Sequence, residues 1–307
     1  MKSDLSSKYD PRAFEAGHSI QPETFDRRVE QRDSLDQHFT KLWLDFAIKG
    51  ISRRPGLDLR TRLLVLAGQY TMAKSHPALE DTIKAALDAR VPAREILEII
   101  LQCTVYGGHT VVDPAIQVFH RVAQERGLME ELRESQLPLN GNDDKRSYEQ
   151  ERKTWHPEDV ADPRLPELIE HHGWLAVGRG LALRPKHHLN ILSWLDKIDR
   201  DFADLWVKFC YGGMYSRGIV DDKTRLLCMI GDCLAVGEET NARGHMRGAM
   251  RNGASPREVL EVIFQTCVNF GMPPMLAALE VFVDIMAHDN RLDEIGNPPV
   301  RVESFGK

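Results

Sequence analysis

The sequence predicts an all-α protein made of two tandem helical modules, and three observations predict it. Apolar residues recur at helical spacing, as Leu63, Leu64 and Leu66 do. No stretch alternates between apolar and polar residues over the length of a strand between hairpin signals. The sequence also matches itself without a gap when it is shifted by 163 positions. Two copies at so long a period indicate duplicated domains, because a solenoid uses more and shorter units.

Three motifs carry this internal repeat. The first pairs leucine and tryptophan with a later glycine, the second opens with aspartate, and the third places glutamate and glutamine at fixed spacing. They are Leu42-Trp43-x-x-Phe46-x-x-x-Gly50 and Leu205-Trp206-x-x-Phe209-x-x-x-Gly213; Asp58-x-x-Thr61-Arg62-Leu63-Leu64 and Asp221-x-x-Thr224-Arg225-Leu226-Leu227; and Arg94-Glu95-x-Leu97-Glu98-x-Ile100-x-Gln102-x-x-Val105-x-x-Gly108 with Arg257-Glu258-x-Leu260-Glu261-x-Ile263-x-Gln265-x-x-Val268-x-x-Gly271.

The repeat predicts the domain organisation. We expect an N-terminal extension over residues 1–29 and a first, degenerate helical module over 30–127. A polar linker with connecting helices then covers 128–189, the second, site-bearing module covers 190–290, and a C-terminal tail covers 291–307. Within the modules, Asp58 and Asp221 are placed to cap equivalent helices.

Composition and charge narrow the class of function. The net charge is -6 and the sequence shows no basic stripe, so it lacks the footprint of a nucleic-acid-binding protein. No apolar run of membrane-spanning length occurs, and the N-terminus shows no secretory signal. We therefore expect a soluble, cytoplasmic protein that acts on a small molecule, without nucleic-acid or membrane partners.

The cysteines do not form a recognisable framework. They are odd in number and none makes a C-x-x-C pair, so the sequence predicts neither a disulfide framework nor a zinc site, but reduced thiols. The adjacent pairs His171-His172 and His187-His188 diverge on a helix and lack a carboxylate at matching spacing, so we expect no bound metal. The five cysteines are Cys103, Cys210, Cys228, Cys233 and Cys267.

The second module contains three motifs in order: a histidine followed by R-G-A-x-x-N-G, a helix that opens with glutamate, and a G-x-P turn. This pattern, which begins at His245, resembles the carboxymuconolactone decarboxylase and alkylhydroperoxidase D superfamily. The resemblance implies a helical bundle that assembles as trimers or hexamers, so that a trimer of this two-module chain would imitate a hexamer. The motifs are His245-Met246-Arg247-Gly248-Ala249-Met250-Arg251-Asn252-Gly253-Ala254, Glu258-Val259-x-Glu261-Val262 and Gln265-x-x-Val268-x-x-Gly271-x-Pro273, joined to Thr224-Arg225-x-Leu227 upstream.

The resemblance implies two possible reactions, and the residues favour one. The peroxidase branch needs a C-x-x-C pair, which neither module has. The decarboxylase branch needs no cofactor, only an acid to protonate a dienolate and a cation to stabilise it. His245 matches the family histidine and is our candidate general acid/base, and Arg225 is our candidate anion stabiliser.

This chain departs from the decarboxylase pattern at one position. The family glutamate four residues before the histidine is replaced by Asn241. Glu238 and Glu239 are nearby substitutes that complete the candidate catalytic set, although Gly237 indicates that the helix starts only there. The substrate could therefore be another acid, lactone or enolisable carbonyl compound.

The first module has lost more of the pattern, because Thr82 stands at the position of His245. It could still complete the site from across the module contact. The candidate substrate-binding residues are Asn241, Arg62, Tyr106, His109 and Tyr70.

The sequence thus favours a cofactor-independent lyase or decarboxylase acting on a small carboxylated lactone or enolisable acid. Two alternatives remain open: a non-catalytic small-molecule-binding or assembly protein, and a thiol peroxidase. Arg225 also recurs as Arg62 in the first module, so a structural ion pair is a rival to anion binding.

Overall fold

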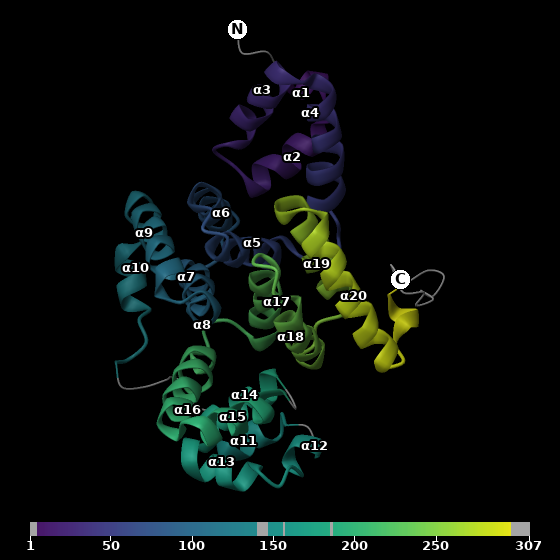
Figure 1. The fold of residues 1–307 in the computed structure, drawn as a ribbon. Coiled ribbons are helices and arrows are strands. Elements are labelled where there is room, and N and C mark those ends of the chain that lie inside the picture. The colour runs from purple at the N-terminus through teal and green to yellow at the C-terminus, as the bar shows by residue number, and fades with distance from the viewer. Residues whose placement is uncertain (1–4, 140–146, 156, 185–186, 296–307) are drawn as a thin grey trace.

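The computed structural model describes residues 5–139, 147–155, 157–184 and 187–295 (Figure 1). These residues form helices and connecting turns without a strand, which confirms the all-α class. None of the helices in the described ranges is long and apolar enough to cross a membrane.

The helices of the N-terminal half begin with a short helix of four residues. They are α1 (Leu5–Lys8), α2 (Pro11–Ile20), α3 (Phe25–Leu35), α4 (Gln37–Trp43), the π-helix η1 (Leu44–Ser52), α5 (Leu59–Met72), α6 (His76–Asp88), α7 (Ala93–Gln102), α8 (Thr104–Gly107), α9 (His109–Glu125) and α10 (Met129–Glu134).

The C-terminal half contains a second π-helix and two 3₁₀ turns. Its helices are α11 (Tyr148–Arg152), α12 (Pro157–Val160), α13 (Leu165–His172), α14 (Trp174–Leu183), α15 (His187–Ile198), α16 (Arg200–Val207), η2 (Lys208–Gly213), η3 (Met214–Ser216), α17 (Asp222–Leu234), α18 (Glu239–Arg251), α19 (Pro256–Phe270), α20 (Met272–His288) and η4 (Leu292–Glu294).

The helix boundaries recur between the two halves. Helix α18 begins and ends 163 residues after α6, α20 does so after α9, and α14 does so after α2. The caps recur too: the Asp58 and Asp221 carboxylates each accept the backbone N–H three residues on, at 2.9 Å. Because α2 and α14 lie outside the predicted modules, we propose that the duplicated unit is longer and includes them.

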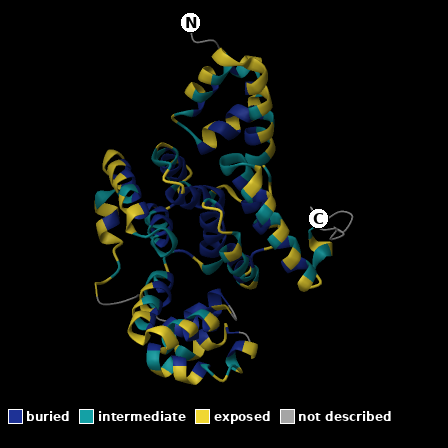
Figure 2. Ribbon diagram, in the orientation of Figure 1, coloured by how far each residue is buried: buried dark blue, intermediate teal, exposed yellow. Residues whose placement is uncertain are grey.

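Helices α5 and α17 cross at the centre of the molecule, where the ribbon is almost entirely buried (Figure 2). Two glycines at equivalent positions allow the close approach. A Cβ on Gly68 would overlap the Asp232 carboxylate of the other helix, and one on Gly231 would lie 2.8 Å from Val65 Cγ1. This crossing joins the two halves through one packed core, and it brings α8 of the first half close to α18 of the second.

Candidate active site

His245 lies on the buried face of α18, and its side chain has no exposure to solvent. Its Nε2 atom is hydrogen-bonded to the hydroxyl of Tyr106, which comes from α8 in the other half of the chain. The two rings meet edge to face, with centroids 5.6 Å apart. The other ring nitrogen, Nδ1, has no partner among the described residues. The structure therefore pairs the imidazole with a phenol across the two halves and leaves one polar ring atom free.

Both members of this pair are neutral at neutral pH. Burial, together with the positive charges of Arg184 and His187, holds the pKa of His245 well below its usual value of 6.5. Burial also raises the pKa of Tyr106 well above its usual value of 10.0. The hydrogen bond thus joins a neutral imidazole to a neutral phenol, and a proton can be handed from one to the other.

Arg184 is the cation of this site, and the sequence did not single it out as a site residue. It follows the end of α14, is only 5% exposed, and lies against Gly244, the residue before His245. Its Nη2 reaches the Asn241 carbonyl oxygen at 3.5 Å, while its Nε has no partner. In the part of the chain that the structure describes, no carboxylate forms an ion pair with it. A buried guanidinium without a counter-ion favours binding of an anion.

Arg225, the predicted anion stabiliser, is instead neutralised. It is fully buried, and its Nη2 donates to Glu98 Oε1 at 2.7 Å. Its Nη1 donates to Gln102 Oε1 at 3.2 Å. Arg217 also binds Glu98, at 2.8 Å. The rival interpretation, a structural ion pair, therefore fits Arg225 better than a substrate-binding role.

The same contacts occur with the halves exchanged. Arg62 donates to Gln265 Oε1 at 3.1 Å and lies 3.8 Å from Glu261. Arg54 holds Glu261 at 2.9 Å, as Arg217 holds Glu98. Reciprocal contacts of this kind are typical of a two-fold interface, here between two halves of one chain.

The remaining predicted residues lie apart from the imidazole. Glu238 is exposed and precedes α18, so it does not share a helical face with His245. It accepts a hydrogen bond from Asn241 Nδ2 at 3.1 Å, and Glu239 stands in the first helical turn. His109 is 81% exposed and lies 3.6 Å from Asp113.

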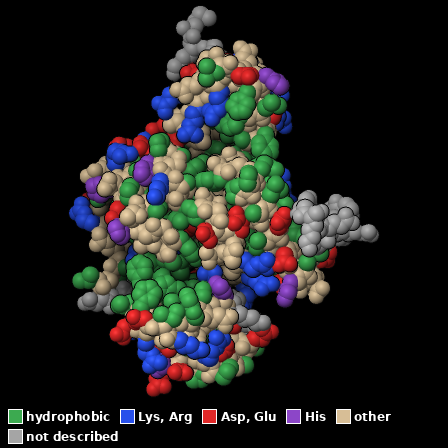
Figure 3. Space-filling view, viewed as in Figure 1, with side chains coloured by type: hydrophobic (Ala, Val, Ile, Leu, Met, Phe, Trp, Pro, Cys, Tyr) green, Lys and Arg blue, Asp and Glu red, His purple; other side chains and the backbone are tan. Residues whose placement is uncertain are grey.

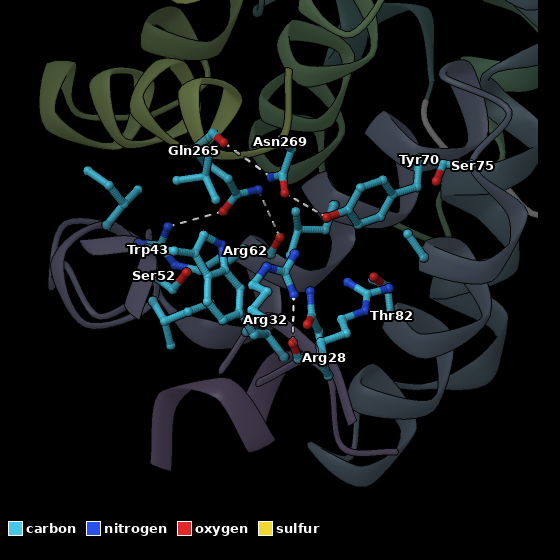
Figure 4. Close-up of a pocket in the computed structure, with 17 residues that line it drawn as sticks. Arg28, Arg32, Trp43, Ser52, Arg62, Tyr70, Ser75, Thr82, Gln265 and Asn269 are labelled. Atoms are coloured by element: carbon cyan, nitrogen blue, oxygen red, sulfur yellow. Dashed lines mark hydrogen bonds between the residues drawn. The ribbon is translucent and has the colours of Figure 1, made fainter. Parts of the chain in front are cut away.

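Arg62 and Tyr70 line a different cavity, of about 260 Å³, in the N-terminal half (Figure 4). The Tyr70 hydroxyl donates to Asn269 Oδ1 at 2.6 Å. Thr82, which stands where the second half has His245, also lines this cavity. The predicted site residues therefore divide between two equivalent places, one in each half.

Comparison with known proteins shows to which family the second half is similar. The model of the carboxymuconolactone decarboxylase family matches residues 200–284. Over 108 residues the chain is 33% identical to 4-carboxymuconolactone decarboxylase of Acinetobacter baylyi, covering 34% of this chain and 81% of that protein. The chain belongs to the carboxymuconolactone decarboxylase family. It is also 35% identical over 95 residues to an uncharacterised 15.0 kDa protein of Paracoccus denitrificans, covering 30% of this chain and 68% of that one.

The segment that matches the family model contains His245 but neither Tyr106 nor Arg184. The fold brings Tyr106 of α8 to the imidazole, and it brings Arg184, after the end of α14, against the neighbouring Gly244. The sequence did offer a signal for Tyr106. The repeat places it near the end of a first-module helix that has an equivalent in the second module, and it was among the predicted substrate-binding residues. Arg184 opens the basic stretch Arg184-Pro185-Lys186, for which the sequence favours a solvated turn over a loop near the pocket.

The thiols of this family member are unsuited to disulfide cycling. All five cysteines are free. Burial raises the pKa of Cys103 and Cys228 well above the usual value of 9.0, and raises that of Cys210 to about 12. Since the thiolate is the reactive form, these environments argue against the thiol peroxidase alternative.

The one histidine cluster with metal-like spacing in the described ranges is already hydrogen-bonded. It comprises His171, His172 and Asp196. The His172 ring bonds Asp196 through Nε2 at 3.1 Å and Asp204 through Nδ1 at 3.3 Å. Arg200 also holds Asp196 at 3.1 Å, which places a positive charge where a cation would have to bind. The cluster is explained as an ion-pair network.

Asp232, at the helix crossing, makes stability depend on pH. It is fully buried, accepts from Gln102 Nε2 at 3.0 Å, and burial raises its pKa to about 8. The unfolded chain releases this proton near pH 4, so stability falls by about 1.4 kcal/mol per pH unit as pH rises from about 4 to 8. We expect Asp232→Asn to remove this slope and to be the more stable form at pH 7.

Urea unfolding at pH 5 and pH 7 measures the effect. Between pH 5 and pH 7, the free energy of unfolding of the parent protein should fall by about 2.7 kcal/mol more than that of the variant. Equal losses in the two proteins would show that the carboxyl is ionised in the native state.

Proposed function

We propose that this chain is a cofactor-independent lyase that acts on a small carboxylated lactone or a related enolisable acid by general acid/base catalysis. The observation that carries the proposal is a neutral imidazole, His245, joined to the Tyr106 hydroxyl beside the buried Arg184, which has no carboxylate partner among the described residues. The similar Acinetobacter protein is named a 4-carboxymuconolactone decarboxylase, which supports this class of reaction.

The three groups suit the steps of such a decarboxylation. The bond between the ring carbon and the carboxylate breaks, CO₂ leaves, and the electron pair passes into the conjugated lactone as a dienolate. The guanidinium of Arg184 stabilises the negative charge on the enolate oxygen. The dienolate carbon then takes a proton from the pair formed by His245 and Tyr106, and solvent restores that proton after product release.

The structure also suggests why the proton donor is a pair. A neutral imidazole gives up its Nδ1 proton only if another proton reaches Nε2, and the Tyr106 hydroxyl stands at that atom. The phenolate left on Tyr106 would be stabilised by Arg184, whose charge already opposes part of the rise in its pKa. No metal or organic cofactor is required in this scheme.

Arg184→Gln tests the proposal. Glutamine is the residue at the equivalent position, Gln21, in the first half. With 4-carboxymuconolactone and other γ-lactone carboxylates as substrates, we expect CO₂ release by the parent protein and a loss of about 10²–10³-fold in kcat/KM for the variant. The matched control is Arg243→Gln, which removes a half-buried arginine of α18 that pairs with Asp284 and should leave the rate unchanged. Equal rates for parent and Arg184→Gln would contradict the assignment.

We also propose that the chain assembles with copies of itself, as a trimer. Large apolar side chains are exposed at equivalent positions of both halves, and they cover much of the surface over α16 (Figure 3). The same apolar surface carried twice on one chain suits contacts between copies in a closed ring. Light scattering of the full chain should give the mass of three copies, and a monomer would contradict this. The residues are Leu35, Phe39, Leu42 and Phe46, and Ile198, Phe202, Leu205 and Phe209.

A further inference from the structure

The cavity of about 260 Å³ in the N-terminal half is walled by helices α3, α5 and α6 and the π-helix η1. Helix α19 of the other half closes it with Gln265 and Asn269 (Figure 4). Three guanidinium groups face this one space, from Arg28, Arg32 and Arg62. The concentration of positive charge distinguishes the cavity from an ordinary packing defect.

Two of these guanidinium groups lack a counter-ion. Arg28 and Arg32 stand one turn apart on α3, a spacing at which like charges destabilise a helix. No carboxylate in the described ranges forms an ion pair with either. Burial and the neighbouring charge of Arg28 lower the pKa of Arg32. The buried Asp81 is close enough to be influenced by Arg28, but its carboxylate is hydrogen-bonded to Thr24.

The third guanidinium and the aromatic walls are already held in place. Arg62 donates to Gln265 Oε1 at 3.1 Å and to the Arg54 carbonyl oxygen at 3.0 Å. The Arg32 guanidinium lies 4.2 Å from the ring centre of Trp43, a cation–π contact that fixes its plane. The Tyr70 hydroxyl is bound to Asn269. Arg32 also donates from Nη1 to the Arg28 carbonyl oxygen at 3.1 Å. Its other N–H groups and the guanidinium of Arg28 have no carboxylate partner in the described ranges and can bind a ligand.

The charge is specific to this half of the chain. The equivalents of Arg28 and Arg32 in the second half are Ile191 and Leu195. Thr82 stands where the second half has His245, so the wall there carries no imidazole. The chemistry available is binding of an anion without acid/base catalysis.

We propose that this cavity is a second ligand site, which binds a small organic dianion of the dicarboxylate class. One carboxylate would be bound by Arg28 and the other by Arg32, because a guanidinium binds a carboxylate through two parallel N–H···O bonds. The volume of about 260 Å³ suits a ligand of metabolite size. The site is separate from the His245 site and does not depend on its activity.

Isothermal titration of the full chain with succinate and with phthalate tests this proposal. We expect saturable binding of one molecule per chain, weakened at least about tenfold in Arg28→Gln and in Arg32→Gln. Arg27→Gln is the matched control, because it makes the same charge change at the adjacent, exposed position of α3. His245→Gln should bind as the parent protein does, which separates this site from the proposed active site.

Three results would overturn the proposal. The first is no saturable binding of either acid below about 10 mM. The second is an equal loss of affinity in Arg27→Gln, which would indicate a non-specific effect of surface charge. The third is binding of inorganic phosphate as tightly as the two dicarboxylates, which would leave the organic part of the ligand without a role.

Discussion

His245→Gln should lower kcat by about 10²–10⁴-fold, the contribution expected from general acid/base catalysis by one side chain. Glutamine fills a similar space and can keep a hydrogen bond to the Tyr106 hydroxyl, but it cannot accept and release a proton at working pH. The variant should therefore fold and bind ligand while losing turnover. The measurement is kcat and kcat/KM on the γ-lactone carboxylate that the parent protein turns over fastest.

The pH profile gives a second readout of the same residue. Because burial and the nearby cations lower the pKa of His245, its ring stays neutral as pH falls through 6.5, where an ordinary histidine gains a proton. We expect the rate of the parent protein to show no inflection at that pH. His109→Gln, an exposed histidine changed in the same way, should leave both rate and profile unchanged. A normal rate in His245→Gln would remove the imidazole from the mechanism.

Glu98→Gln should lower the free energy of unfolding by about 3–5 kcal/mol, because breaking a buried ion pair leaves an uncompensated charge in the core. Glu98 has no exposure to solvent and binds two arginines at once, Arg225 at 2.7 Å and Arg217 at 2.8 Å. Arg225 is itself fully buried, so water cannot replace the lost carboxylate. Urea unfolding followed by far-UV circular dichroism measures the loss.

The other half of the chain supplies a matched control at Glu261, which lies 163 residues after Glu98. Its two close partners, Arg54 and Arg257, are 31% and 48% exposed, so water can solvate them when the carboxylate is lost. The buried Arg62 is farther from the carboxylate, at 3.8 Å. Arg62 remains bound to Gln265. Glu261→Gln should therefore cost clearly less than Glu98→Gln. Similar costs for the two variants would mean that burial of Arg225 does not set the size of the effect.

Much of the architecture could be predicted from local patterns. The capping aspartates Asp58 and Asp221 and the capping box of Ser255 and Glu258 define helix starts that the structure shows. The helix start predicted near Gly237 lies two residues before the observed first helical residue, Glu239. Each of these signals acts within a few residues along the chain, which is why the sequence alone reveals it.

The residues of the candidate sites were harder to predict from the sequence, because the fold brings distant segments together there. His245 was found because it lies in a contiguous family motif. The partners of Arg225 could not be read from the chain, since Glu98 and Gln102 lie more than a hundred residues away. Arg184 resembled a solvated turn residue, but its position under Gly244 buries it.

By itself, the sequence determined the helical class, the 163-residue offset and the histidine motif, because periodicity, caps and motifs are properties of neighbouring residues. Only the tertiary structure decided which charges are neutralised and which remain unpaired. It bound Arg225 to Glu98 and left Arg184, Arg28 and Arg32 without a carboxylate partner among the residues that the structure describes. The physical reason is that the pairing of a charge depends on what burial brings within a few ångströms of it, and segments distant in the chain supply those groups.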